Sequence, residues 1–323
     1  MQLPPSLREA IDRELEGVSL RDLARASETL SQRYRAEVQD GRLHLGDELA
    51  ARAYLTTRLP ATFAAISSAL GAAAEARPDF APRTLLDAGA GPGTATWAAA
   101  QHWSCLQDAV LIEASPAIRA VGERLGQALP LERTNWIAGR LDATLSDLTP
   151  RDLVLIAYVL DELPPAAREP LIAQLWHLTA DTLLIVEPGT TEGWKRILHA
   201  RDILIRAGAY LLAPCPHAHA CPLIAPDWCH FSARLARSRL HREAKGGTVP
   251  WEDEKFIYLA ASRQPGVQPA ARVIAPPRVS KAIITLKLCQ QDGYAADRTF
   301  AKRSGESFKT ARKLDWGDIL QRD

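Results

Sequence analysis

Six short apolar runs between residues 84 and 263, separated by longer stretches with helical periodicity, constrain the fold of this 323-residue chain more than any other feature. In order, they read TLLDAG, AVLIEAS, WIAGRLD, DLVLIAYVL, TLLIVEPG and KFIYLAASR. Brief apolar runs that alternate with helices are typical of a parallel sheet whose two faces are both covered by helices. We therefore expect a doubly wound α/β domain over residues 79–263.

The chain on either side of this domain has a different texture. Residues 1–78 repeat apolar side chains at helical spacing, with Ser19 as an N-cap and an interruption at Pro60, which predicts a helical N-terminal region. After Arg263 the sequence is rich in proline and then strand-like (RVSKAIITLKLCQQDGY), which predicts a small β-rich C-terminal extension over 264–323. The charged N-terminus, and the lack of any run of about 20 apolar residues, favour a cytoplasmic protein without membrane contact.

A glycine-rich turn follows the first apolar run, in the stretch LLDAGAGPGTATWAA. Gly89, Gly91 and Gly93 would let the chain turn tightly and let a ligand approach the backbone, while the next helix offers free N–H groups at its N-terminus. Asp87 lies two residues before the first of these glycines. A nucleotide-like ligand suits such a turn, and a purely structural turn is the alternative.

Two further acids extend this pattern. Glu113 ends the second predicted strand, where a carboxylate can accept hydrogen bonds from both ribose hydroxyls of an adenosine. Asp142 follows the third predicted strand, at a point that could reach the adenine amino group. The spacing Asp-x-Gly-x-Gly-x-Gly resembles motif I of class I S-adenosylmethionine-dependent methyltransferases, in which the acid faces the methionine amino group. The resemblance implies a class I methyltransferase (Rossmann-like) fold that binds S-adenosylmethionine through Asp87, Gly89, Gly91, Gly93, Glu113 and Asp142.

The same resemblance gives a meaning to DLVLIAYVLDELP, residues 152–164, as the fourth strand and the exit loop where the methyl group meets its acceptor. Asp161 and Glu162 in this loop could act as a general base, orient the acceptor, or simply cap the following helix. Methyl transfer from a sulfonium needs mainly in-line positioning and the loss of a proton. The loop holds neither an Asn-Pro-Pro-Tyr run nor a cysteine, so the sequence does not identify the acceptor atom.

The stretch LLAPCPHAHACPLIAPDWCHF, residues 211–231, forms a cysteine-rich insertion with Cys215, Cys221 and Cys229. An odd total of five cysteines in a reducing compartment argues for thiols, a metal or a catalytic sulfur rather than a disulfide framework. Cys289 is the candidate for a fourth ligand, because the remaining Cys105 lies in the helical region after the glycine turn. The histidines of the stretch could instead complete a Cys₃His zinc site, so iron–sulfur and zinc are both open, as are inert thiols. These histidines are His217, His219 and His230.

Positive charge is concentrated in the second half of the chain. Residues 232–247 hold five Lys/Arg and one acid, and residues 264–323 hold eleven Lys/Arg and six acids, in a chain with a net charge of +1. Such asymmetry suggests a polyanionic partner, RNA or DNA, and a solvated helix face with a basic tail is the alternative. Phe300, Phe308 and Trp316 could stack on bases or form the core of the extension.

Together these elements resemble the small-ribosomal-subunit methyltransferase-like proteins of bacteria and mitochondria, from about residue 80 to the end. The resemblance rests on LLDAGAGPGTATWAA, VLDELP, VEPGTTEGW, CPHAHACPL, DWCHFSARLAR, DEKFIYLAASR, LCQQDG and ARKLDWGD. It implies an rRNA methyltransferase that acts in small-subunit maturation and translation, with small-subunit rRNA or a subunit precursor as partner and no DNA. It also implies that Cys215, Cys221, Cys229 and Cys289 hold a structural [4Fe–4S] cluster, which favours iron–sulfur over zinc. A non-catalytic assembly factor with the same fold and a zinc-containing small-molecule methyltransferase are the alternatives.

Overall fold

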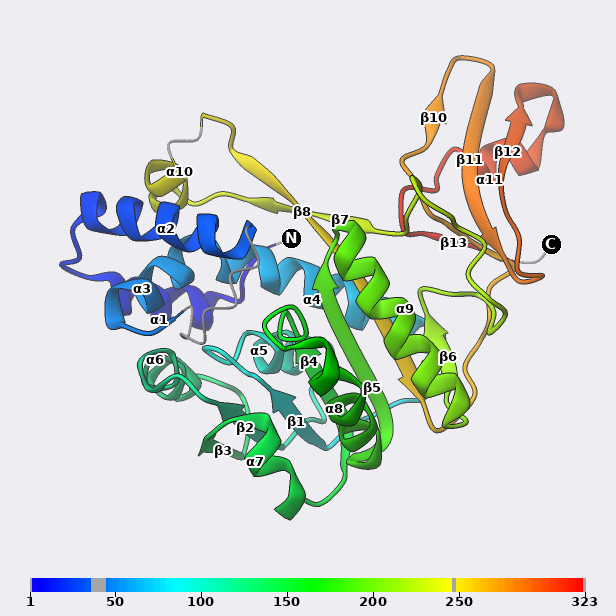
Figure 1. Ribbon diagram of the computed structural model, residues 1–323. Helices are drawn as coiled ribbons and strands as arrows, with labels where there is room; N and C mark the ends of the chain where they lie inside the picture. The colour runs from blue at the N-terminus through cyan, green and yellow to red at the C-terminus, as the bar shows by residue number, and fades with distance from the viewer. Residues whose placement is uncertain (1, 36–44, 246–247, 322–323) are drawn as a thin grey trace.

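The structure, a computed structural model, describes residues 2–35, 45–245 and 248–321, and eight strands of these residues form a central mixed sheet (Figure 1). The strand order is β3-β2-β1-β4-β5-β8-β6, and β7 pairs with β8 on the same side as β6. Strands β1 to β5 are parallel, whereas β8 is antiparallel to β5, β6 and β7. The bounds are β1 Thr84–Ala88, β2 Asp108–Glu113, β3 Arg133–Ala138, β4 Arg151–Ala157, β5 Thr179–Pro188, β6 Tyr210–Ala213, β7 Phe231–Ala236 and β8 Trp251–Ser262.

This sheet confirms the predicted fold class, with one correction. The six apolar runs form β1 to β5 and β8, and the inner strands are buried along almost their whole length because helices cover both faces. The sheet is not wholly parallel, however, since β8 is reversed, and the sequence did not predict β6 and β7. A parallel sheet with a reversed strand next to one edge is the arrangement of class I methyltransferases.

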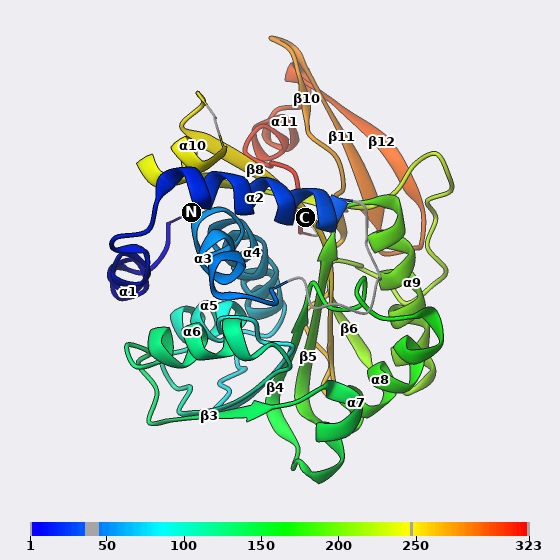
Figure 2. The same ribbon diagram turned by 60° about the vertical axis from the view of Figure 1, so that its left-hand side comes forward.

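Helices lie on the two faces of the sheet. α4 (Leu59–Ala76) packs against α5 (Thr94–His102) and against β5 to β8, whereas α8 (Pro165–His177) and α9 (Thr191–Arg206) cover β5 from the opposite face (Figure 2). The other helices are α1 Pro5–Leu15, α2 Leu20–Arg35, α3 Glu48–Thr57, α6 Pro116–Gly126, α7 Leu141–Thr144 and α10 Arg239–Lys245, with a 3₁₀ turn at Leu145–Asp147. None of the helices in the described ranges combines the length and the hydropathy needed to cross a membrane.

The predicted helix signals in the N-terminal region are confirmed. The Asp22 N–H donates to Ser19 Oγ at 3.4 Å, at the start of α2. Pro60 lies in the first turn of α4, where its missing N–H costs no hydrogen bond, so the helical run divides between Thr57 and Leu59. Residues 36–44 of this region lie outside the described residues.

A second, antiparallel sheet forms the predicted β-rich extension. Its described strands are β9 Ala271–Val273, β10 Arg278–Val279, β11 Ile283–Gln290, β12 Ala295–Ala301 and β13 Ile319–Leu320. A 3₁₀ turn at Lys302–Ser304 and the helix α11 Glu306–Ala311 lie between β12 and β13. Phe300 and Phe308 belong to its own buried core with Ile284, Leu286 and Leu288. These two aromatic rings are therefore not available to stack on bases. The division of the chain at residues 78 and 263 stays a prediction.

The cysteine-rich insertion leaves the central sheet and returns to the same side of one strand. Ala213 at the end of β6 pairs with Ala260 of β8, and Phe231 at the start of β7 pairs with Phe256 of β8. β6 and β7 therefore follow one another along β8, and residues 214–230 form an excursion between them. This topology carries the insertion away from the sheet edge toward the C-terminal sheet, at the right of Figure 1.

Candidate functional site

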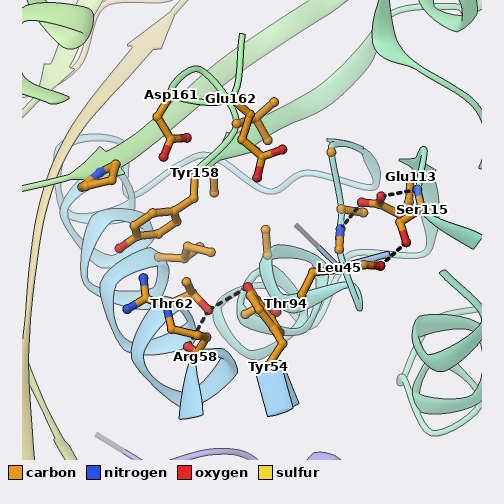
Figure 3. Close-up of a pocket in the computed structure, with 18 of the residues that line it drawn as sticks. Leu45, Tyr54, Arg58, Thr62, Thr94, Glu113, Ser115, Tyr158, Asp161 and Glu162 are labelled. Carbon is orange, nitrogen blue, oxygen red and sulfur yellow. Dashed lines mark hydrogen bonds between the residues drawn. The ribbon is translucent and has the colours of Figure 1, made fainter. Parts of the chain in front are cut away.

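A cleft of about 1360 Å³ lies at the carboxyl ends of β1, β2, β4 and β5 (Figure 3). Ligands of open α/β sheets bind at this end, where the connections after neighbouring strands diverge. Helices α2, α3 and α4 supply one wall of the cleft, and the β7–α10–β8 region supplies another. Seven of the eight cofactor-binding and catalytic residues expected from the sequence line it, and they are Asp87, Gly89, Gly91, Glu113, Asp142, Asp161 and Glu162.

Asp87 lies at the base of the cleft and is 1 % exposed. Its Oδ2 accepts hydrogen bonds from the backbone N–H of Thr96 at 3.1 Å and from Thr96 Oγ1 at 2.8 Å. Burial raises the pKa of Asp87 to about 6, because the carboxylate is removed from water. The carboxylate is therefore ionised at neutral pH and can attract a cationic group in the cleft.

Glu113 ties the glycine turn to the end of β2. Its Oε2 accepts from the Gly91 N–H at 2.8 Å, and its Oε1 accepts from the Ser115 N–H at 2.7 Å. Burial raises the pKa of Glu113, and the backbone N–H groups oppose that rise by stabilising the charged form. Each carboxylate oxygen retains a further lone pair that can accept a ligand hydroxyl.

The three glycines of the turn have different roles. All three adopt positive φ values of 76° at Gly89, 56° at Gly91 and 82° at Gly93. A Cβ at Gly91 would meet nothing within 4 Å, whereas a Cβ at Gly89 would lie 2.5 Å from Val159 Cγ2. Gly93 is the N-cap of α5, lies against Leu111 and is outside the set of residues that line the cleft. Gly91 is thus the position where a side chain would enter open cleft space.

Asp142 lies at the outer rim, in the first turn of α7. Its side chain is 70 % exposed and approaches Arg140 Nε at 3.4 Å. This exposed pair contributes little to stability, so it leaves the carboxylate available to a ligand.

Asp161 and Glu162 lie in the loop after β4, at the other end of the cleft from Glu113 (Figure 3). Asp161 is 7 % exposed, whereas Glu162 contacts solvent at the cleft mouth. Burial in the cleft walls, followed by the nearby Asp161 charge, raises the pKa of Glu162. Neither acid occupies the N-cap position of α8, because that position is Pro164.

Sequence reasoning missed a group of residues beside this loop. Tyr158 adopts φ 59°, a left-handed conformation that is strained for a tyrosine. Its hydroxyl donates to Glu254 Oε1 at 3.3 Å, and Arg58 Nη2 lies 3.8 Å from the same oxygen. Burial raises the pKa of Tyr158 well above its usual value, so the hydroxyl stays protonated. Arg58 comes from the N-terminal helices and carries no motif, so no sequence signal could have identified it.

The four-cysteine site, defined as Cys215, Cys221, Cys229 and Cys289, draws on both sheets. Cys215 follows β6, Cys229 precedes β7, and Cys289 lies in β11 of the C-terminal sheet. Burial raises the pKa of Cys229 well above its usual value and that of Cys289 to about 12, and in each case neighbouring cysteines of the site raise it further. The thiols are therefore close enough to affect one another. All five cysteines are free, and Cys105 hydrogen-bonds the Pro82 carbonyl oxygen elsewhere.

Of the histidines proposed as alternative ligands, one contacts a cysteine of the site and another packs on two tryptophans. His217 Nε2 lies 3.4 Å from Cys289 Sγ, while His230 stacks on Trp228 and meets Trp316 edge-on at 4.8 Å. Trp316 therefore packs on the cysteine-rich insertion. Among the described residues, no group of three or more His, Cys, Asp or Glu side chains is arranged to hold a metal ion.

The donor chemistry around these cysteines nevertheless suits an anionic thiolate centre. One zinc ion would draw the thiolate sulfurs to roughly 3.8 Å from one another, given Zn–S bonds of about 2.3 Å. A four-iron cluster holds its thiolates farther apart, so it does not require the cysteines to converge on a single point. Two guanidinium groups, Arg201 at 1 % and Arg272 at 3 % exposed, are buried beside the insertion. Their side chains donate to backbone carbonyl oxygens of His217, His219 and Pro214.

The basic run at residues 232–247 is largely neutralised within the fold. Arg237 and Lys245 pair with Glu252, at 3.2 and 2.6 Å, and Arg234 pairs with Asp253 at 2.7 Å. Burial would raise the pKa of Glu252, but hydrogen bonds from His241 and Lys245 outweigh it and lower that pKa. The last two residues of the run, 246–247, lie outside the described residues. In the described C-terminal sheet, by contrast, Lys281, Lys302 and Arg303 have no carboxylate within ion-pair distance.

Comparison with known proteins gives one family and more distant structural likenesses. The family model described as "Mitochondrial small ribosomal subunit Rsm22" matches residues 48–321. The human mitochondrial ribosome assembly protein METTL17 is 29% identical over 285 residues, which are 83% of this chain and 61% of that protein. The chain thus spans less than two thirds of this relative's length.

Among solved structures, the chain resembles the magnesium protoporphyrin IX methyltransferase of Synechocystis with bound S-adenosylmethionine (TM-score 0.41, 15% identity, 77% of this chain and 100% of that one). It also resembles an O-methyltransferase family protein from Burkholderia thailandensis (TM-score 0.44, 14% identity, 74% and 69%). At these TM-scores, the strand order rather than the overlap carries the fold assignment.

Proposed function

Because the chain belongs to the mitochondrial small ribosomal subunit Rsm22 family, we propose that it is an S-adenosylmethionine-dependent rRNA methyltransferase that acts in small-subunit maturation. The observation that supports it most is the single cleft in which the glycine turn, Asp87 and Glu113 lie opposite the loop after β4. A relative described as a ribosome assembly protein supports the small-subunit partner. A cytoplasmic location is part of the proposal, whereas the human relative is mitochondrial by name.

The residues of the cleft would divide the binding of S-adenosylmethionine among them. Asp87 would pair with the methionine ammonium group, Glu113 would accept the ribose hydroxyls, and Asp142 would accept from the adenine amino group. The bound molecule supplies an electrophilic methyl group. Asp161 and Glu162 would orient the acceptor and take up its proton, and the raised pKa of Glu162 brings it closer to the pKa of an effective base at neutral pH.

Turnover is tested with methyl-labelled S-adenosylmethionine and small-subunit rRNA. We expect labelled rRNA with the native protein, and a loss of at least a hundredfold in rate for Asp161→Asn combined with Glu162→Gln, given the usual contribution of general base catalysis. Absence of label, with S-adenosylmethionine and rRNA both bound, would replace the proposal with a non-catalytic assembly factor.

We propose further that the four-cysteine site holds a structural [4Fe–4S] cluster. Within residues 214–230, Asp227 N–H to Ile224 carbonyl oxygen is the one backbone–backbone hydrogen bond that the structure gives. A segment with so little regular hydrogen bonding gains order from a covalent centre. Because Cys289 comes from the other sheet, the centre would also join the two sheets.

Iron, sulfide and zinc analysis of anaerobically purified protein, with an absorption spectrum, tests this cluster. We expect about four irons per chain, and loss of iron and absorbance in Cys221→Ser but not in the matched Cys105→Ser control. One zinc per chain without iron would establish the zinc alternative instead.

A further inference from the structure

Arg201 is buried beside the four-cysteine site without a buried counter-charge. It lies on α9 and is 1 % exposed, and its Nη2 donates to the carbonyl oxygens of His217 at 2.9 Å and His219 at 2.6 Å. The carboxylate of Asp202, 3.8 Å from its Nη1, belongs to a side chain that is 61% exposed. Its Nε is buried and has no hydrogen-bond partner. The guanidinium is thus held in place, and the carboxylate that pairs with it is exposed to solvent rather than buried.

Arg272 repeats this arrangement from the C-terminal sheet. It lies on β9 opposite Cys289 and is 3 % exposed. Its Nε donates to the Pro214 carbonyl oxygen at 2.6 Å, and its Nη1 donates to the Gly317 carbonyl oxygen at 2.7 Å. Within the described residues, no carboxylate lies within ion-pair distance of it.

Two buried cations without a buried carboxylate partner are costly. Carbonyl dipoles solvate a guanidinium in part, but a buried charge normally requires an opposite charge. Arg272 lies opposite Cys289 in the β9–β11 pair and donates to the carbonyl oxygen of Pro214, next to Cys215. Arg201 donates to the carbonyl oxygens of His217 and His219, which lie between Cys215 and Cys221, so both guanidinium groups are near enough to compensate a charge held there.

We propose that Arg201 and Arg272 are the counter-charges of a dianionic metal–thiolate centre at the four-cysteine site, and that they govern its retention and its reduction potential. This inference rests on the proposed cluster. Four thiolates on an oxidised [4Fe–4S] core give a charge of −2, which two guanidinium groups cancel. Reduction by one electron gives −3, so loss of either arginine disfavours the reduced form more than the oxidised form.

The test separates charge from hydrogen bonding. In the first pair of variants, Arg272→Gln and Arg201→Gln, a hydrogen-bond donor is kept but the charge is lost. In the second pair, Arg272→Lys and Arg201→Lys, the charge is kept but the planar, forked set of guanidinium N–H donors is lost. Each full-length variant is reconstituted anaerobically with ferrous iron and sulfide, and its folding is checked by circular dichroism. Iron per chain, the rate of iron loss to a chelator and the midpoint potential are then measured, with Cys221→Ser as the control that lacks a ligand.

We expect the glutamine variants to lose iron at least tenfold faster than the native protein, and their redox equilibrium to shift tenfold toward the oxidised form, about 59 mV for one electron. The lysine variants should stay close to native. If the glutamine, lysine and native proteins lose iron at the same rate and share one midpoint potential, the inference is wrong while the proposed cluster stands. The same holds if a lysine variant loses iron as fast as its glutamine counterpart. A native protein that takes up no more iron than Cys221→Ser overturns the proposed cluster and this inference together.

Discussion

Alanine substitution at two neighbouring glycines distinguishes a cofactor site from a structural turn. A Cβ at Gly91 meets nothing within 4 Å, so Gly91→Ala costs only the left-handed backbone strain at φ 56°, about 1–2 kcal/mol of unfolding free energy. A Cβ at Gly89 lies 2.5 Å from Val159 Cγ2, so Gly89→Ala adds about 1–3 kcal/mol of overpacking to the same strain. We therefore expect Gly89→Ala to lose roughly 2–5 kcal/mol, well over the loss in Gly91→Ala.

The expected loss of S-adenosylmethionine affinity in Gly91→Ala is large, although its expected loss of unfolding free energy is the smaller of the two. The new methyl group at Gly91 enters the cleft beside the Glu113 carboxylate, where it would compete with the ligand for space. An overpacking cost of about 1–3 kcal/mol corresponds to a roughly 5- to 150-fold loss of affinity. Urea denaturation and calorimetric titration at neutral pH measure the two quantities. Native affinity in a folded Gly91→Ala protein would show that the ligand does not occupy this turn, and the proposed cofactor site would be wrong.

Because burial raises the pKa of Asp87 to about 6, S-adenosylmethionine affinity should be level above pH 6. Below pH 6 the affinity should fall about tenfold per pH unit as the carboxylate is protonated. Calorimetry should show no such fall in Asp87→Asn. Removing the charges of Lys302 and Arg303 should lower the slope of log K against log salt concentration for rRNA binding by roughly one to two units. Arg239, which pairs with Glu243, serves as a control whose replacement should leave this slope nearly unchanged. Equal slopes in all variants would exclude Lys302 and Arg303 as the rRNA-binding surface. Glu187→Gln removes a buried carboxylate that accepts from Arg196 Nε at 2.6 Å, so urea denaturation should show a loss of about 3–5 kcal/mol, and a loss below about 1 kcal/mol would contradict the importance of the pair.

The strands of the central sheet could be predicted because each is apolar on both faces. Leu85 and Leu86 of β1 point to opposite faces and are both fully buried, a pattern that only a covered sheet produces. The direction of β8 could not be predicted, since an apolar run has no sign that separates parallel from antiparallel pairing. β6 is only four residues long and ends next to a proline-rich stretch, so it resembled a loop.

The neutralisation of the basic run at residues 232–247 could not be predicted, because a count of charges along the chain omits partners on the neighbouring strand. Arg234 of β7 is opposite Asp253 of β8, and the acids at 252–254 lie beyond the window in which the basic run was counted. Cross-strand pairs of opposite charge are neighbours in space although they are far apart in sequence. Arg58 illustrates the same point in the cleft, because it lies between α3 and α4 and only the tertiary packing of these helices brings it there.

The cysteine-rich insertion links the cleft to the C-terminal sheet. Trp228 Nε1 donates to the Gly189 carbonyl oxygen at 3.1 Å, and Gly189 lines the cleft at the end of β5. On its other side, the insertion contacts the C-terminal sheet through the ion pair of Asp227 with Lys287. Because the insertion has little hydrogen bonding of its own, whatever orders it positions both neighbours at once. Iron loading and S-adenosylmethionine affinity should therefore be coupled, since both depend on the order of one segment.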